Sequence, residues 1–165
     1  IVFGDWSSDV CSSDLPTLVL DDGGSLYDSP VICDYLDQLH GGTRMIPETG
    51  AARWRVLREQ ALGDGVLDNA VLIFVELNKR PEEKRWDWWL QLKQRAIERA
   101  LDHLENDAGG LVGRIDLGTI SIAVALAYLD LRGAVGQWRT GRPALATWFA
   151  DFAQRPSMIA TAPPG

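Results

Sequence analysis

The chain has 165 residues and a formal net charge of −7, and 46% of its residues are apolar or aromatic. This apolar content suits a hydrophobic core, and the length suits one domain or one and a half. The acidic balance argues against nucleic acid as a partner, because contacts with phosphates need clustered Lys and Arg. With two Cys and two widely separated His, the chain offers no disulfide framework, and no metal site is expected.

The hydropathy pattern indicates neither a membrane span nor a secretory signal. The longest strictly apolar run is 122–129, well short of the ~20 residues that cross a bilayer. The N-terminal stretch has no basic residue and no long apolar segment. A membrane partner is therefore not expected, and the low cysteine content favours a reducing cytoplasm.

Residues 1–14 differ in character from the rest of the chain. They contain a repeated Ser-Ser-Asp and show neither a helical nor a strand period. The segment resembles a translated sequencing-adapter peptide, and we interpret it as a non-native leader; the alternative is a native polar leader. Nothing around Cys11 would activate its thiol, so it is not a candidate nucleophile.

Residues 15–40 are predicted to form a strand, a tight turn, a short strand and a helix. The stretch 17–20 suits a buried strand, and the acidic-glycine run 21–24 suits a hairpin turn, because Gly adopts positive φ without steric cost. Ser29 is predicted to cap the helix, with Pro30 at the first helical position and Gly41-Gly42 as its end. The apolar side of this helix follows at helical spacing: Val31, Ile32, Tyr35, Leu36 and Leu39.

Residues 41–50 are predicted to be a linker, in which Met45 and Ile46 can anchor the boundary, and 51–165 are predicted to be helical. The first helix of this part spans 51–78 and contains Gly63 and Gly65. A helical Gly costs about 1 kcal/mol relative to Ala, which predicts close packing or a bend. The predicted apolar side comprises Trp54, Leu57, Ala61, Leu62, Val66, Leu67, Ala70, Val71 and Phe74.

Three further helices are predicted. One begins at Pro81 and runs to about 106; its apolar side holds Trp86, Leu90, Ile97, Leu101 and Leu104, and of Trp86, Trp88 and Trp89 at least one should be exposed. Asp116 should cap the most apolar helix, which should lie at the centre of a bundle. In this motif the acid comes first and Thr119 last, the reverse of the usual capping box, so the reciprocal box is expected to be altered. The last helix, 144–154, should bury one face made of Leu145, Trp148, Phe149 and Phe152.

The order of these motifs resembles the bacterial glutathione S-transferase family. The resemblance rests on Leu15-Pro16 before a strand, on Asp28-Ser29 at a helix start, and on the helical part with Arg155-Pro156-Ser157 near its end. It implies a mostly α protein, in which an all-helical C-terminal bundle follows a partial thioredoxin-like α/β domain. The expected domains are a leader at 1–14, the thioredoxin-like part at 15–40, a linker at 41–50 and the all-α domain at 51–165.

The resemblance also implies a glutathione site at the start of the 29–39 helix. Ser29 would bind the γ-glutamyl carboxylate of glutathione, and Asp28 would help to hold its amino group. A cis peptide before Pro16 would let the Leu15 backbone pair with the cysteinyl part of glutathione. A helix N-terminus suits a carboxylate because its N–H groups and dipole are positive. The alternative is that Ser29 serves only as an ordinary helix cap and binds no ligand. Asp64 and Asp68 could line a substrate cleft, or could be solvated surface acids.

The activity implied is transfer of the glutathione thiolate to small electrophiles by a homodimer, with glutathione as co-substrate and no metal. In the family, the first strand, first helix and second strand precede the proline motif and carry the Ser, Tyr or Cys that activates the thiol. The chain is therefore expected to be N-terminally truncated and inactive alone, and its catalytic residue stays unknown. The alternatives are a glutathione-dependent reductase or dehalogenase, and a non-catalytic interaction module.

Overall fold

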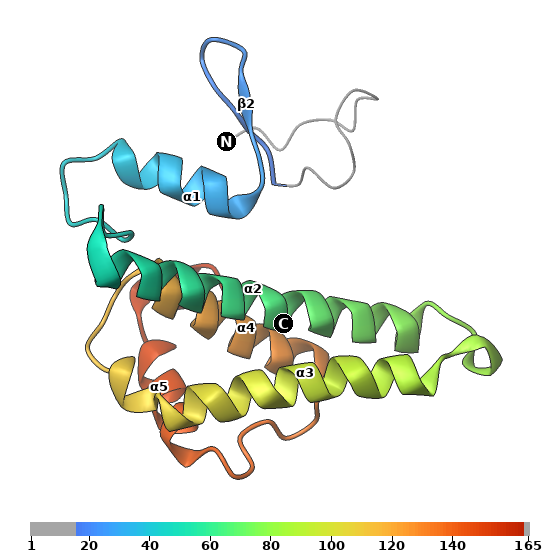
Figure 1. The fold of residues 1–165 in the computed structure, drawn as a ribbon. Coiled ribbons are helices and arrows are strands. Elements are labelled where there is room, and N and C mark those ends of the chain that lie inside the picture. Colours follow the sequence, from blue (N-terminus) through green and yellow to red (C-terminus); the bar gives the residue numbers. More distant parts are fainter. Residues whose placement is uncertain (1–15, 164–165) are drawn as a thin grey trace.

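The computed structural model describes residues 16–163 and shows a hairpin and a helix above a helical bundle (Figure 1). The prediction of a mostly α protein is confirmed. The expectations for 1–14 and for Leu15 lie outside the described residues. In chain order the elements are β1 (Leu18–Val19), β2 (Ser25–Leu26), α1 (Ser29–Gln38), α2 (Gly50–Asn78), η1 (Glu82–Lys84), α3 (Asp87–Asn106), η2 (Ala108–Gly110), α4 (Leu117–Arg132), α5 (Pro143–Phe152) and α6 (Pro156–Ala160).

The hairpin forms where the sequence predicts it, but its first strand is not buried as expected, since Val19 is 62% exposed. β1 and β2 are antiparallel, with Leu18 opposite Leu26. In the turn, the Gly23 N–H donates to the Leu20 carbonyl (3.0 Å), and the Gly24 N–H donates to the Asp22 carboxylate (2.9 Å). Gly23 has φ +86°, a conformation that side chains rarely adopt, so the acidic-glycine run suits this turn.

Helix α1 begins and ends differently from the prediction. Its first hydrogen bond runs from the Ile32 N–H to the Asp28 carbonyl (3.1 Å), so Asp28, not Ser29, is the N-cap residue and Pro30 is the second helical residue. The helix ends at Gln38, before Gly41-Gly42. The reason is Asp37, whose carboxylate accepts the backbone N–H groups of Met45 (2.7 Å) and Ile46 (2.9 Å) and so turns the chain back.

The segment after α1 is anchored to the bundle. Ile46 is 2% exposed and packs with Val56 and Leu117 in a small second core. The Leu117 N–H donates to the Met45 carbonyl (3.1 Å), which ties this segment to the start of α4. The position of α1 relative to α2 and α4 is therefore set by hydrophobic packing and by backbone hydrogen bonds.

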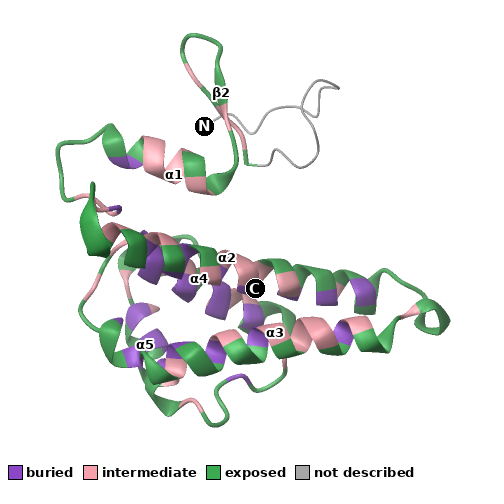
Figure 2. Cartoon of the chain, viewed as in Figure 1, coloured by how far each residue is buried: buried purple, intermediate pink, exposed green. Residues whose placement is uncertain are grey.

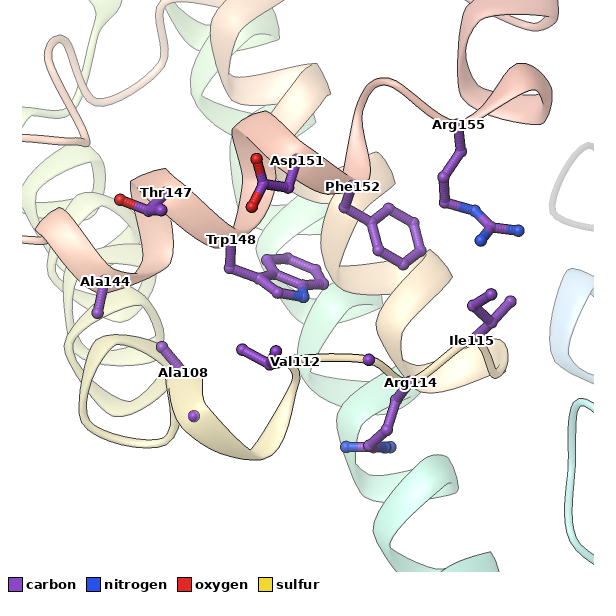
Figure 3. Close-up of a pocket in the computed structure, with 12 residues that line it drawn as sticks. Ala108, Val112, Arg114, Ile115, Ala144, Thr147, Trp148, Asp151, Phe152 and Arg155 are labelled. Atoms are coloured by element: carbon purple, nitrogen blue, oxygen red, sulfur yellow. The ribbon is translucent and has the colours of Figure 1, made fainter.

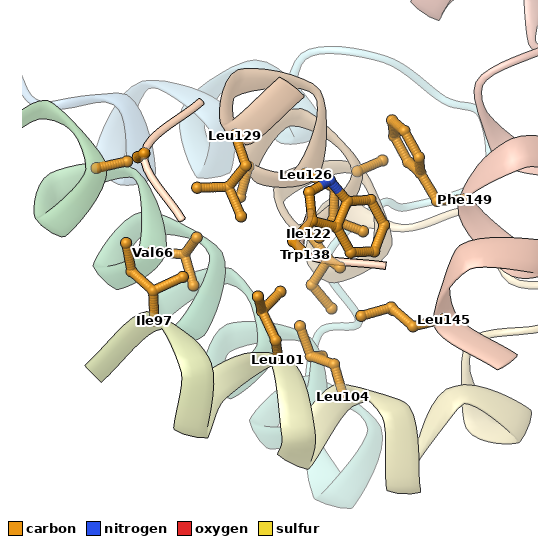
Figure 4. Packing of buried hydrophobic residues seen from close by; sticks show 14 of the residues in the cluster. Val66, Ile97, Leu101, Leu104, Ile122, Leu126, Leu129, Trp138, Leu145 and Phe149 are labelled. Atoms are coloured by element: carbon orange, nitrogen blue, oxygen red, sulfur yellow. The ribbon is translucent and has the colours of Figure 1, made fainter. Parts of the chain in front are cut away.

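The main core lies between α2, α3, α4 and α5, whose buried faces point toward one another (Figure 2). Figure 4 shows Trp138 among Ile122, Leu126 and Phe149, and its ring meets that of Phe149 edge-on at 5.9 Å. The buried residues predicted for 81–106 and for 144–154 are confirmed, with Trp86 as the exception: Leu90, Ile97, Leu101, Leu104, Leu145, Trp148, Phe149 and Phe152 are all buried.

Helices α2 and α4 approach closely through glycine. A Cβ added at Gly63 would lie 2.8 Å from the backbone carbonyl of Ser121, and one added at Gly118 would lie 2.6 Å from the Glu59 carboxylate. Real Cβ atoms do not come so near to other atoms, so both positions need Gly. The predicted packing role holds for Gly63 but not for Gly65, where a Cβ would meet nothing within 4 Å.

Three expectations for α2 and α3 are wrong. On the predicted apolar side of α2, Trp54 is 68% exposed and Val71 is 41% exposed, whereas Glu59 and Glu76 are buried. The Glu76 carboxylate accepts the Trp86 N–H (3.0 Å), so α3 begins at Asp87 and not at Pro81, and Trp86 is 60% exposed. Trp88 is exposed as well, as the three-Trp pattern predicts.

The N-terminus of α4 keeps a reciprocal capping box. The Thr119 N–H donates to the Asp116 carboxylate (3.0 Å), and the Asp116 N–H donates to the Thr119 hydroxyl (3.1 Å). The predicted Asp116 cap is confirmed, whereas the expectation of an altered box is wrong: Thr at the third position supplies the oxygen that Glu or Gln usually supplies.

Candidate functional site

The N-terminus of α1 presents Asp28 and Ser29 to solvent. Both residues are exposed, and the Asp28 carboxylate makes no capping hydrogen bond to α1. The first N–H groups of a helix have no partner within it, and they carry the positive end of the helix dipole. An anionic group of a ligand can therefore meet N–H donors here, beside a hydroxyl and a carboxylate.

Two acids of α2 belong to the same neighbourhood. Asp64 is half-buried and Asp68 is exposed. Burial raises the pKa of the Asp64 carboxyl above its usual range, and the negative charges of Asp68 and Asp28 raise it further. The interaction with Asp28 reaches from α2 to α1, so the structure brings Asp28, Asp64 and Asp68 together electrostatically.

The thiol of Cys33 lies one turn beyond Ser29 on α1 and is half-buried. Burial raises the pKa of this thiol, and the negative charges of Asp64 and Asp37 add to the effect. The thiolate is the nucleophilic form of cysteine, so this environment suits a structural thiol and not a catalytic one.

Sequence reasoning missed Asp37, which is buried at the end of α1. Burial alone would raise the pKa of its carboxyl, but the hydrogen bonds from Met45 and Ile46 and the positive charges of Arg44 and His40 lower it below the usual range. The one indication in the sequence is the position of Asp37 in the last turn of the helix, four residues before the glycine pair.

Sequence reasoning also missed the ion-pair network of Arg114. Its guanidinium donates to both oxygens of the Glu59 carboxylate (2.9 and 2.6 Å) and to the Asp116 carboxylate (3.0 and 2.7 Å). The hydrogen bonds that Arg114 donates to Glu59, and then those that it donates to Asp116, raise its pKa despite its burial. The Glu59 pairing spans 55 residues of sequence, which no local pattern reveals.

The other predicted site residues are placed only in part. Pro16 is exposed, and Leu15 lies outside the described residues, so the isomer of the peptide between them and the backbone pairing of Leu15 stay predictions. Within 16–163 there is no group of three or more His, Cys, Asp or Glu side chains that could hold a metal ion. None of the helices described is long and apolar enough to cross a membrane.

Sequence comparisons match both parts of this architecture. Residues 11–44 match the family described as "Glutathione S-transferase, N-terminal domain", and residues 87–151 match "Glutathione S-transferase, C-terminal domain". The GST-like protein YibF of Escherichia coli K12, described as uncharacterized, is 32% identical over 91% of this chain and 75% of its own length. The chain belongs to the glutathione S-transferase family.

Solved structures of bacterial members of the family are similar to this chain in fold. A family member from Pseudomonas fluorescens Pf-5, solved with S-(propanoic acid)-glutathione, is 48% identical, with a TM-score of 0.89 over 92% of this chain and 78% of the other. A transferase from Methylobacillus flagellatus KT, solved with glutathione, is 34% identical, with a TM-score of 0.84 over 91% and 76%. These relatives place the present chain among the bacterial transferases.

Proposed function

We propose that this protein binds glutathione at the N-terminus of α1, through Asp28 and Ser29. We propose further that its activity is that of the family, conjugation of the glutathione thiolate to small electrophiles. The observation that carries the proposal is an exposed acid-Ser pair at an uncapped helix start, electrostatically coupled to Asp64 of α2. Relatives at 48% and 34% identity were solved with glutathione or a glutathione conjugate bound, which supports the same ligand here.

Each end of the γ-glutamyl group has a matching partner in this arrangement. The carboxylate would accept hydrogen bonds from the Ser29 hydroxyl and from nearby N–H groups of α1, and the helix dipole would strengthen them. The ammonium would lie beside the Asp28 carboxylate, and the charges of Asp64 and Asp68 would add to the attraction. The cysteinyl backbone would pair with the Leu15 backbone, as an added strand does.

Conjugation needs a deprotonated glutathione sulfur, which forms a bond to the electrophilic atom as a leaving group departs or a double bond takes up the electron pair. The raised pKa of Cys33 makes it unsuitable for supplying this chemistry. In the family the activating Ser, Tyr or Cys precedes the proline motif, so we propose that Cys33, which follows that motif, does not activate the glutathione sulfur.

We also propose a cytoplasmic homodimer. Large apolar side chains are exposed along the outer side of α2 and at the start of α3: Val71, Leu72, Val75, Trp86 and Trp88. Exposed apolar groups gathered in this way are typical of protein interfaces. Sedimentation should show a dimer that Val75→Glu weakens.

The binding proposal is tested by calorimetric titration with S-methylglutathione, which has no thiol to activate. Ser29→Ala should weaken binding by about tenfold or more, since a hydrogen bond to a charged group is worth about 1.5–3 kcal/mol. Ser25→Ala, on the exposed β2 strand, is the matched control and should leave the affinity unchanged. Equal affinities for the wild type, Ser29→Ala and Asp28→Ala would refute the site, and no binding at all would favour a non-catalytic interaction module.

A further inference from the structure

A cavity of about 570 Å³ lies within the helical part of the chain, away from the α1 site. Its lining comes from 108–115, between α3 and α4, and from 144–155, on α5 and the turn after it (Figure 3). The volume lies in the range of small-molecule sites. Apolar walls come from Val112, Ile115, Trp148 and Phe152.

The aromatic wall is held in one orientation. The Trp148 indole N–H donates to the Leu111 carbonyl (3.2 Å), which fixes the ring against the loop on the other side of the cavity. The Phe152 ring lies 5.1 Å from that of Trp148, tilted by 37°, and the Arg155 guanidinium lies 5.2 Å from the Phe152 ring. Trp148, Phe152 and Arg155 thus form a continuous stack along one wall.

Arg155 is the residue of this cavity whose side chain lacks a polar partner in the described part of the chain. Among the described residues its Nε is the buried side-chain polar atom that lacks a hydrogen-bond partner, and its guanidinium forms no ion pair with any described carboxylate. Buried polar groups are nearly always hydrogen-bonded, so such an atom calls for a partner outside the described residues. The backbone around Arg155 is fixed by bonds to the Phe152 carbonyl and from the Ile159 N–H.

The other charges of the cavity do not compete for this role. Arg114 is already balanced by the carboxylates of Glu59 and Asp116. Figure 3 shows the Asp151 carboxylate and the Arg155 guanidinium on opposite sides of the Phe152 ring. The cavity therefore offers an apolar wall with the Arg155 cation at one end and the Asp151 carboxylate on the other side of Phe152.

We propose that this cavity binds a small aromatic carboxylate, whose ring lies against Trp148 and Phe152 and whose carboxylate accepts from Arg155. A carboxylate satisfies the guanidinium through charge-assisted hydrogen bonds, and the rigid rings accept a flat apolar body at little entropic cost. The site is independent of glutathione binding, because neither α1 nor α2 lines it.

The probe is naphthalene-1-carboxylate, titrated calorimetrically into the 165-residue chain, with naphthalene-1-methanol as the uncharged counterpart. The carboxylate should bind saturably with one site per chain, and the alcohol should bind about tenfold more weakly or worse. Arg155→Gln should reduce the affinity for the carboxylate to that for the alcohol. Arg132→Gln is the matched control, because Arg132 also stacks on a ring, that of Phe74 at 4.4 Å, but lies outside the cavity.

A second variant keeps the proposal testable if Arg155→Gln disturbs folding. Val112 is exposed and lines the cavity, so Val112→Trp should fill the space without loss of core packing and should abolish binding. Ser29→Ala should leave naphthalene-1-carboxylate binding intact, which separates this site from the glutathione site. The proposal is overturned by an absence of saturable binding at millimolar probe, by equal binding of the alcohol, or by an unchanged affinity in Val112→Trp.

Discussion

Arg114, between α3 and α4, donates hydrogen bonds of 2.9 and 2.6 Å to the two oxygens of the Glu59 carboxylate on α2. Both side chains are largely buried, with exposed fractions of 16% and 6%. A buried charge that loses its partner keeps its desolvation cost, so the pair constrains the fold more strongly than a surface ion pair would. It fixes the start of α4 against the first half of α2.

The first prediction concerns this pair. Arg114→Ala should lower the free energy of unfolding by about 3 kcal/mol, because it leaves Glu59 buried without its cation. Arg53→Ala, which removes the more exposed pair with Asp34 (3.3 Å), is the control and should cost no more than about 1 kcal/mol. Urea denaturation measures both, and equal effects of the two changes would contradict the prediction.

The second prediction compares two glycines of α2. Gly63→Ala should destabilise the protein by about 1–3 kcal/mol, because its Cβ would press on the Ser121 carbonyl. Gly65→Ala should stabilise it by about 0.5–1 kcal/mol, since the added Cβ meets open space and a helical Gly is unfavourable. Thermal denaturation of the two variants should therefore shift in opposite directions; a shift in the same direction would mean that α2 and α4 are farther apart.

The third prediction separates the two halves of the capping box of α4. Thr119→Val removes the hydroxyl that accepts the Asp116 N–H and should cost about 1 kcal/mol. Thr147→Val, on the exposed side of α5, is the matched control and should change stability by less than about 0.5 kcal/mol. If Thr119→Val has no larger effect than its control, the reciprocal bond does not contribute to stability.

The fourth prediction is a pH dependence that arises from Asp37. Its pKa is lowered in the folded state, so the folded protein binds a proton there less readily than the unfolded chain does. The stabilisation is fully present above the unfolded pKa of about 3.9 and is lost as the pH falls through the folded pKa. Asp37→Asn should therefore be less stable than wild type at pH 7, and the difference should shrink below about pH 4.

The fifth prediction has the opposite sign and concerns Asp64. Its pKa is raised in the folded state, so ionisation above that pKa opposes folding. Asp64→Asn should raise the melting temperature at pH 7, and the gain should vanish as the pH falls and the wild-type carboxyl takes up its proton. A gain that is independent of pH would show that the pKa of Asp64 is not raised in the folded state.

The parts of the fold that could be predicted are those whose structure depends on residues close together in the sequence. The hairpin turn depends on Gly23 and Asp22, the start of α4 depends on Asp116, and the buried face of α5 repeats at helical spacing. Each of these is complete within a few residues of chain, so local conformational preferences and periodicity suffice.

The rest depends on partners that are distant in sequence. The burial of Glu59 depends on Arg114, which lies 55 residues away in sequence, and α3 starts late because Glu76 reaches the Trp86 N–H. For the site, the sequence named Asp28, Ser29, Asp64 and Asp68, but neither the coupling of Asp64 to Asp28 nor the cavity at Arg155 could be read from it. Both arise from the packing of separate elements.

The backbone contact at Gly63 also bears on ligand binding. Asp64 follows Gly63 directly, so the close approach of α2 to the Ser121 carbonyl of α4 also affects where this carboxylate lies. Any larger residue at 63 would lift α2 from α4 and shift the Asp64 charge relative to α1. In the proposed glutathione site, the attraction of Asp64 for the ligand's ammonium group would therefore depend on a residue that has no side chain.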